Sequence, residues 1–161
     1  MRSFKCIASA AALALTAPAS AELPVSPLRD IYVSYNDCFK VAAKGGMKPE
    51  VLATLGWSRA TMSSGGKPVA DGPMIYGHAK RAPIIILSAD KGDGLCIVMA
   101  RLETTKAYEE FMSAWGGKLP KPAADGTITF FAEGHPIMLK RTGSTQKPSM
   151  TISVMTPMET K

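Results

Sequence analysis

Histidine, cysteine and tryptophan are scarce in this sequence: its 161 residues include two histidines, three cysteines and two tryptophans. With two histidines and no evident acid to orient either, a Ser-His-Asp triad cannot be argued. A zinc site would need further ligands at fixed spacing, and none is visible. The G-x-S-x-G elbow, the Walker loop and the Rossmann fingerprint are also absent from the sequence. We therefore predict no metal and no cofactor, and the missing motifs favour a non-enzymatic protein over an enzyme.

Long apolar runs and a strong charge bias are missing as well. Nothing after the first residues is long and apolar enough to span a bilayer. The formal net charge of +6 is modest, and an excess of this size is usually a solvated surface. We therefore expect no nucleic-acid partner. Hydrophobic residues make up 46% of the chain, which is too apolar for a disordered protein and indicates a globular one.

The first 21 residues have the pattern of a secretory signal peptide. Arg2 and Lys5 form a positive start, an apolar stretch of Ala, Leu and Ile follows, and Ala19–Ala21 is an A-x-A cleavage site. The apolar stretch is too short for a membrane anchor, and Pro18 breaks it. We expect cleavage before Glu22, and the compact cleavage site favours a bacterial periplasm.

Cleavage would leave residues 22–161, a chain of 140 residues that is long enough for one exported domain with a real core. Arg2 and Lys5 leave with the signal, so the net charge falls from +6 to +4. We predict a periplasmic or secreted protein with no stable membrane anchor after processing.

Two cysteines remain in the mature chain, Cys38 and Cys96. In an oxidising compartment two thiols in one small domain most often pair. Cys38 lies on the apolar stripe of an expected helix and Cys96 in an expected strand, and a helix packed on a sheet can join such positions. We predict this disulfide, worth about 4 kcal/mol in the chain-entropy model. A reactive thiol is the weaker alternative, because apolar neighbours lower the reactivity of a thiol such as that of Cys96.

The apolar periodicity predicts a helix-rich start followed by strands. Ser26 would cap a first helix, and Thr104 or Thr105 a third. The segment 58–72 is Gly/Ser-rich and indicates a loop with one weak strand around Arg59–Met62. The expected helices are Pro27–Lys44, Pro49–Gly56 and one from Thr104 or Thr105 to about Trp115. The expected strands are Met74–Tyr76, Pro83–Ser88, Leu95–Leu102, Thr127–Ala132, Pro136–Arg141 and Met150–Met155, with a hairpin turn at Asp90–Gly94.

Two halves of the chain, about residues 47–103 and 104–156, look alike. Each contains a tryptophan that ends a helix, then Ala-Asp-Gly, a strand, Gly-His, and two further strands. This ordered recurrence favours a duplication over chance similarity. The predicted fold is therefore α+β: a mostly antiparallel sheet of about six strands with helices on one face. It would be built from two αβββ-like repeats plus an extra N-terminal helix.

Candidate binding residues come from the scarce and the basic side chains. The two histidines occupy matching slots in the two halves, and a Lys-Arg pair follows each. They could line a groove or a basic patch for an anionic ligand or an acidic protein, since Arg binds such groups bidentately. The alternatives without a binding role are that the histidines are ordinary turn or strand-end residues and that the Lys-Arg pairs lie on a solvated sheet edge. The candidates are Trp57, on an expected exposed loop, and His78, Lys80, Arg81, His135, Lys140 and Arg141.

The sequence thus favours a small exported binding or interaction module, acting on an envelope or extracellular protein or on an anionic ligand. The alternative is an envelope hydrolase with a site at the repeat interface, using His78 and His135 as acid and base. A weaker third hypothesis is a copper carrier that uses Met150, Met155 and Met158, because thioethers bind Cu(I).

Overall fold

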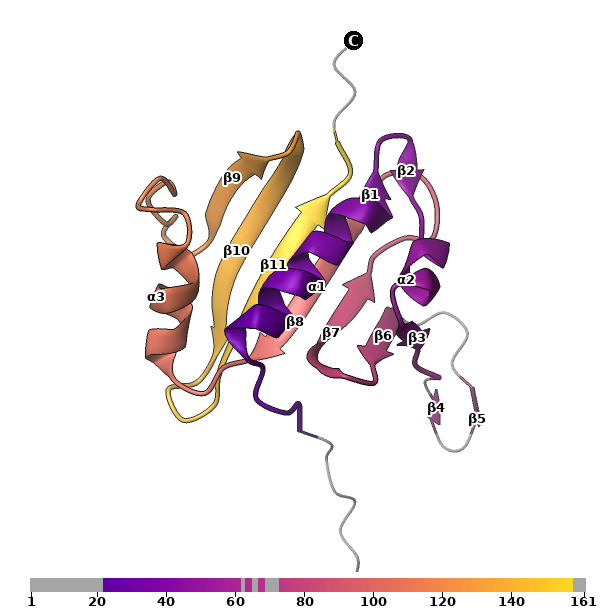
Figure 1. Cartoon of the computed structure of the whole chain (residues 1–161), viewed down its shortest axis with the longest axis horizontal. Helices are drawn as coiled ribbons and strands as arrows, with labels where there is room; N and C mark the ends of the chain where they lie inside the picture. Colours follow the sequence, from indigo (N-terminus) through magenta and orange to yellow (C-terminus); the bar gives the residue numbers. More distant parts are fainter. Residues whose placement is uncertain (1–21, 62, 65–66, 69–72, 158–161) are drawn as a thin grey trace, which may run out of the picture.

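A computed structural model of the chain describes residues 22–61, 63–64, 67–68 and 73–157 (Figure 1). The predicted signal peptide at 1–21 lies outside the described residues. So do Met62, the Ala-Asp-Gly of the first half at 70–72, and Met158.

The described residues form three helices, one large sheet and two small hairpins. The helices are α1 (Leu28–Val41), α2 (Glu50–Thr54) and α3 (Thr105–Ser113). The large sheet contains β3 (Trp57–Arg59), β6 (Met74–His78), β7 (Arg81–Leu87), β8 (Leu95–Arg101), β9 (Ile128–Ala132), β10 (His135–Gly143) and β11 (Pro148–Met155). The small hairpins pair β1 (Ala42–Ala43) with β2 (Gly46–Met47), and β4 (Ser63–Ser64) with β5 (Lys67–Pro68).

The large sheet is antiparallel, with seven strands in the order β3-β6-β7-β8-β11-β10-β9. Two meanders, β6-β7-β8 and β9-β10-β11, join through their last strands, so β8 and β11 pair near the middle. The α+β prediction with a mostly antiparallel sheet is confirmed. The seventh strand is β3, in the segment that the sequence indicated as mainly loop.

One face of the sheet carries the core. Side chains alternate between the faces of a strand, so the register aligns a row of apolar residues across six strands. Every member of the row is buried: Tyr76, Ile85, Val98, Ile152, Leu139 and Ile128. Helix α1 crosses the middle of this face and contacts β7, β8 and β11 (Figure 1).

The predicted disulfide is present and ties α1 to the central strand β8. Cys38 and Cys96 are joined with their Cα atoms 5.4 Å apart, and both side chains are fully buried. Helix α3 packs beside α1, where the rings of Tyr32 and Phe111 stack with centroids 4.5 Å apart. In the described part of the chain the longest helix has 14 residues, and none has the length and apolar character that a membrane crossing requires.

The first helix is shorter than the sequence predicted. It ends at Val41 rather than Lys44, because the next residues turn into the β1–β2 hairpin. Gly46 has φ +115°, and a Cβ there would lie 2.9 Å from the backbone oxygen of Gly92. The hairpin thus packs against the β7–β8 turn, where Met47 N donates to Gly92 O at 2.8 Å.

Only one of the two predicted helix caps forms. Thr104 caps α3, with its hydroxyl accepting from Ala107 N at 3.3 Å. Ser26 does not cap α1: Pro27 is the N-cap residue, and the buried Ser26 hydroxyl has no partner among the described residues. The helix begins at Leu28, one residue later than expected, so Pro27 takes the N-cap position and Ser26 lies one residue outside it.

Candidate functional site

Three of the seven predicted binding residues meet on the helix-covered face, and a fourth lies in the adjoining turn. Trp57 opens β3, His78 ends β6 and Arg81 opens β7, and the register places Trp57 opposite His78 and His78 opposite Arg81. Lys80 lies in the turn between β6 and β7. Above them passes α1, which contributes Asp37, a residue that the sequence did not single out.

Asp37 holds this group together, and we call it the Asp37 cluster: Asp37, Lys40, Trp57, His78, Lys80 and Arg81. The Asp37 Oδ2 atom accepts from Trp57 Nε1 at 3.0 Å and from Arg81 Nη1 at 2.6 Å. Lys40 Nζ lies 3.6 Å from the other carboxylate oxygen. Asp37 is 3% exposed, and a buried carboxylate is tolerated only when it is paired and hydrogen-bonded in this way.

Trp57 is not the exposed loop residue that the sequence suggested. It is 3% exposed, because β3 joins the sheet and turns the indole beneath α1. The guanidinium carbon of Arg81 lies 5.6 Å from the ring centroid, within cation–π range. Trp57 therefore positions Arg81 and is not available as a direct contact for a partner.

His78 packs edge-on against the Trp57 indole, with the ring centroids 5.2 Å apart. Its Nδ1 atom accepts from the backbone N of Lys80 at 3.0 Å, so in the neutral ring the proton is on Nε2. Gly56, at φ +86°, leaves the space for this ring, since a Cβ there would lie 2.9 Å from His78 Nε2. Among the described residues no hydrogen bond joins His78 to Asp37, whose bonded partners are Trp57 and Arg81.

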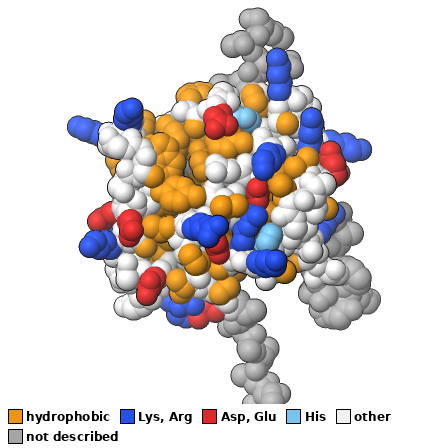
Figure 2. All heavy atoms as spheres, viewed as in Figure 1, with side chains coloured by type: hydrophobic (Ala, Val, Ile, Leu, Met, Phe, Trp, Pro, Cys, Tyr) orange, Lys and Arg blue, Asp and Glu red, His pale blue; other side chains and the backbone are white. Residues whose placement is uncertain are grey.

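The outer part of the cluster presents hydrogen-bond donors and positive charge of the kind that an anion requires. Arg81 uses Nη1 on Asp37, and 20% of its side chain remains exposed with further N–H donors. Lys40, whose side chain is 56% exposed, and the exposed Lys80 extend this surface. Figure 2 shows Lys and Arg side chains and a histidine grouped on the face that α1 covers. A guanidinium held in place by a buried carboxylate is suited to bind carboxylate or phosphate groups.

The matching residues of the second half do not join the cluster. His135 is buried, donates from Nδ1 to Met155 O at 2.8 Å and packs on Phe39. Lys140 Nζ lies 2.8 Å from Asp125 Oδ2, and this hydrogen bond holds the pKa of Asp125 well below its usual range. Arg141 is exposed.

The two histidines lie at opposite ends of the sheet. Strands β6 and β10 run in the same direction, and His78 ends the first while His135 begins the second. Four strand spacings also separate them, which is about 19 Å. A shared groove holding both rings, which the hydrolase hypothesis required, is therefore not formed.

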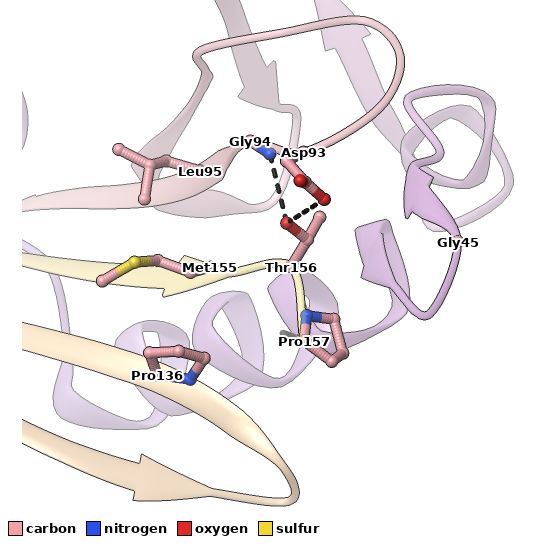
Figure 3. Close-up of a pocket in the computed structure, with 8 residues that line it drawn as sticks. All are labelled: Gly45, Asp93, Gly94, Leu95, Pro136, Met155, Thr156 and Pro157. Atoms are coloured by element: carbon pink, nitrogen blue, oxygen red, sulfur yellow. Dashed lines mark hydrogen bonds between the residues drawn. The ribbon is translucent and has the colours of Figure 1, made fainter. Parts of the chain in front are cut away.

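A hollow of about 610 Å³ lies at the end of the sheet where β8 and β10 begin and β11 ends (Figure 3). Leu95, Pro136 and Met155 give it an apolar wall. On the other side, Thr156 Oγ1 donates to Asp93 Oδ1 at 3.2 Å and accepts from Gly94 N at 3.2 Å. No sequence pattern indicates this hollow, because its lining comes from four separate segments.

The methionines do not form the copper site of the third hypothesis. Met150 is fully buried under the helices, while Met155 lines the hollow from the opposite face of the same strand. In residues 22–157, as far as they are described, no three His, Cys, Asp or Glu side chains gather to hold a metal.

Asp37 is the functional candidate that sequence reasoning missed. One acidic residue beside Cys38 in an amphipathic helix has the same local pattern as a solvated surface carboxylate. Its role depends on β3 and β7, which the sequence places far away. The chain matches no protein-family model, no curated protein and no solved structure.

Proposed function

We propose that this protein is an exported, disulfide-stapled binding module that acts in the bacterial periplasm or outside the cell and is not an enzyme. The N-terminal signal pattern supports the route of export. The Cys38–Cys96 bond supports an oxidising destination, because such bonds persist there and are rare in a reducing cytosol.

The binding surface in this proposal is the outer part of the Asp37 cluster, formed by Lys40, Lys80 and Arg81. The observation that carries it is the Arg81 guanidinium, fixed by Asp37 at 2.6 Å and by the Trp57 ring below it. Fixing the guanidinium in advance lowers the entropy cost of binding an anionic group. We propose an acidic envelope or extracellular protein as the partner, bound through its carboxylates.

A pull-down from envelope extract tests this function. The bait is the oxidised mature protein, and the bound proteins are identified by mass spectrometry. We expect one stoichiometric partner at low salt, lost as salt rises because exposed ion pairs are screened. A variant with Lys40→Glu and Lys80→Glu should lose the partner. Lys118→Glu, a charge reversal at an exposed site beyond α3, should keep it.

The possible failures are separable. An empty lane with wild-type bait at low salt would contradict an interaction function and shift attention to small ligands. A partner retained equally by wild type and by the Lys40/Lys80 variant would contradict the surface but keep the function. Urea unfolding of each variant confirms that the bait is folded.

We also infer that the sheet arose by duplication of one αβββ-like unit, with α1 as an addition. The inference is supported by two meanders of the same strand order that meet through β8 and β11. In each half a tryptophan follows a helix, and a Gly-His pair lies near the junction of the first two strands of the meander: Gly77 and His78 end β6, whereas Gly134 precedes β10 and His135 begins it. A chain in which residues 74–101 replace residues 128–155 should fold if the units are equivalent, and its failure to fold would count against the inference.

A further inference from the structure

The second face of the sheet is apolar but carries no helix. Its central row runs across six strands in register: Ile75, Ile86, Ile97, Ser153, Met138 and Thr129. The next row continues with Ile84, Met99, Thr151 and Lys140. All three helices pack on the other side, since α1 contacts the sheet core and both α2 and α3 pack against α1. We call this surface the open face.

The strands beneath the open face have the composition of strands covered on both sides. β8 reads Leu-Cys-Ile-Val-Met-Ala-Arg, and β7 contains three consecutive isoleucines. An antiparallel sheet with one solvated face normally alternates apolar with polar residues, whereas near-continuous apolar runs belong to strands buried on both faces. Phe131, at 66% the most exposed large apolar side chain among the described residues, also lies on this face, at its β9 edge.

The open face is large enough for a stable protein interface. Seven strands span about 29 Å across the sheet, and six residues of strand span about 20 Å along it. The flat area given by these two lengths, increased by the relief of the side chains, approaches the roughly 800 Å² that each partner buries in a standard interface. Contiguous apolar surface of this extent on a monomer marks an interaction site.

We propose that the open face binds a second copy of this chain, forming a face-to-face homodimer with a two-fold axis perpendicular to the strands. The central row contains no charge, and Lys140 in the next row is paired with Asp125 at 2.8 Å, so two copies can meet there without burying an unpaired ion. Both Asp37 clusters would remain on the outer surfaces, so the proposal is independent of the function proposed above.

The charges at the two ends of the sheet fit this orientation. The turns at the upper end in Figure 1 carry Asp90, Asp93 and Glu133 against two cations, Lys44 and Lys91. Outside the Asp37 cluster, the strand ends and turns at the lower end carry Arg101, Arg141 and Lys147 against Glu22 and Glu103. A two-fold axis across the strands brings the acidic end of one copy to the basic end of the other, twice. Such complementarity fixes the orientation of partners.

Sedimentation velocity of the oxidised mature chain between about 1 and 100 µM tests the proposal. We expect a mass twice that of the 140-residue chain at the upper concentration. Ile97→Lys, in the middle of the open face, should be monomeric at every concentration. Ala114→Lys adds the same charge at an exposed position after α3 and should leave the dimer intact.

A second variant covers the possibility that Ile97→Lys does not fold. Ile97→Thr keeps a β-branched side chain suited to a strand, and it should weaken the dimer at least tenfold while the protein retains its circular dichroism spectrum. Raising the salt from 50 to 500 mM should also weaken the dimer, because the paired ends are exposed.

Three results would overturn the proposal. A wild-type chain that remains monomeric at 100 µM would leave the open face to a different occupant. A folded Ile97→Lys variant that still dimerises would place the interface elsewhere. A dimer whose affinity does not change with salt would rule out the orientation in which the acidic end of one copy meets the basic end of the other.

Discussion

Asp37 is the residue on which most polar contacts beneath α1 depend. One buried carboxylate oxygen accepts hydrogen bonds from a β3 indole and a β7 guanidinium. It therefore joins three segments that are distant in the sequence. Losing it would leave two donors without an acceptor in a nearly dry environment, and such donors cost more than the bond itself contributes.

We predict that Asp37→Ala lowers the free energy of unfolding by about 2–4 kcal/mol, the low part of this range applying if the partly exposed Arg81 regains water. Asp37→Asn keeps an acceptor for Trp57 and should lose about half as much. Urea denaturation with the disulfide intact measures both. An Asp37→Ala protein as stable as wild type would show that the cluster contributes nothing to folding.

Tyr35 is a buried residue whose hydroxyl has no partner in the described part of the chain. Burial, with the nearby Glu133 carboxylate, raises the pKa of Tyr35 from 10.0 to about 12. Because the folded protein holds the proton more tightly than the unfolded chain, the resulting stabilisation is complete below pH 10. It is lost as the pH rises from 10 towards 12.

We predict that Tyr35→Phe changes stability little at pH 7, since it removes a hydroxyl that makes no hydrogen bond. Between pH 10 and 12 its melting temperature should fall less steeply than that of wild type. Burial also raises the pKa of Tyr32 and of Tyr108, so some alkaline sensitivity should remain. Identical alkaline slopes for both proteins would contradict the burial effect at Tyr35.

At the scale of elements, the Cys38–Cys96 bond joins α1 to the strand beneath it across 58 residues. Replacing both cysteines with serine should lower the free energy of unfolding by about 4 kcal/mol, because the unfolded chain regains the freedom of that loop. Urea unfolding measures the loss, and wild type treated with a reductant should match the variant. Unchanged stability on reduction would contradict a structural role for the bond.

Periodicity predicted the central elements well and the peripheral ones poorly. Strands β7, β8 and β11 and helix α3 lie close to their predicted positions because their apolar residues repeat at the period that burial requires. The three-residue strand β3 had no such pattern. The end of α1 was placed too late, since the β1–β2 hairpin depends on contact with the distant Gly92.

The candidate site was predicted only in part, for a related reason. Trp57, His78, Lys80 and Arg81 were identified as scarce or basic side chains, and the pairing of β3, β6 and β7 brings them together. Their matching positions in the second half diverge, because His135 and Lys140 bond to local partners. The exposure of Trp57 was predicted wrongly, since burial is set by the helix above it.

At the scale of the whole molecule, the mature chain is expected to begin at Glu22. The Glu22 carboxylate lies 2.9 Å from Lys147 and 3.5 Å from Arg101, and the Lys147 contact, with help from Arg101, lowers its pKa. The first residues are thereby held at the basic end of the sheet.

We predict that the protein recovered from a bacterial periplasm has the intact mass of residues 22–161 minus two hydrogens for the disulfide. Ala21→Phe places a large side chain at the A-x-A site and should leave the precursor uncleaved and attached to the inner membrane. A periplasmic protein that retains residues 1–21 would contradict signal cleavage.

The position of β11 has a consequence for how the chain can fold during export. Residues 148–155 form the strand between β8 and β10, so in a chain exported as proposed above the two meanders join only after this late segment has crossed the membrane. A chain that emerges from its amino end must wait with β8 and β10 unpaired on facing edges, which invites misassociation. If the protein is exported in this way, the sheet is completed only at the end of translocation, and a chain truncated before Pro148 would expose these edges to envelope proteases.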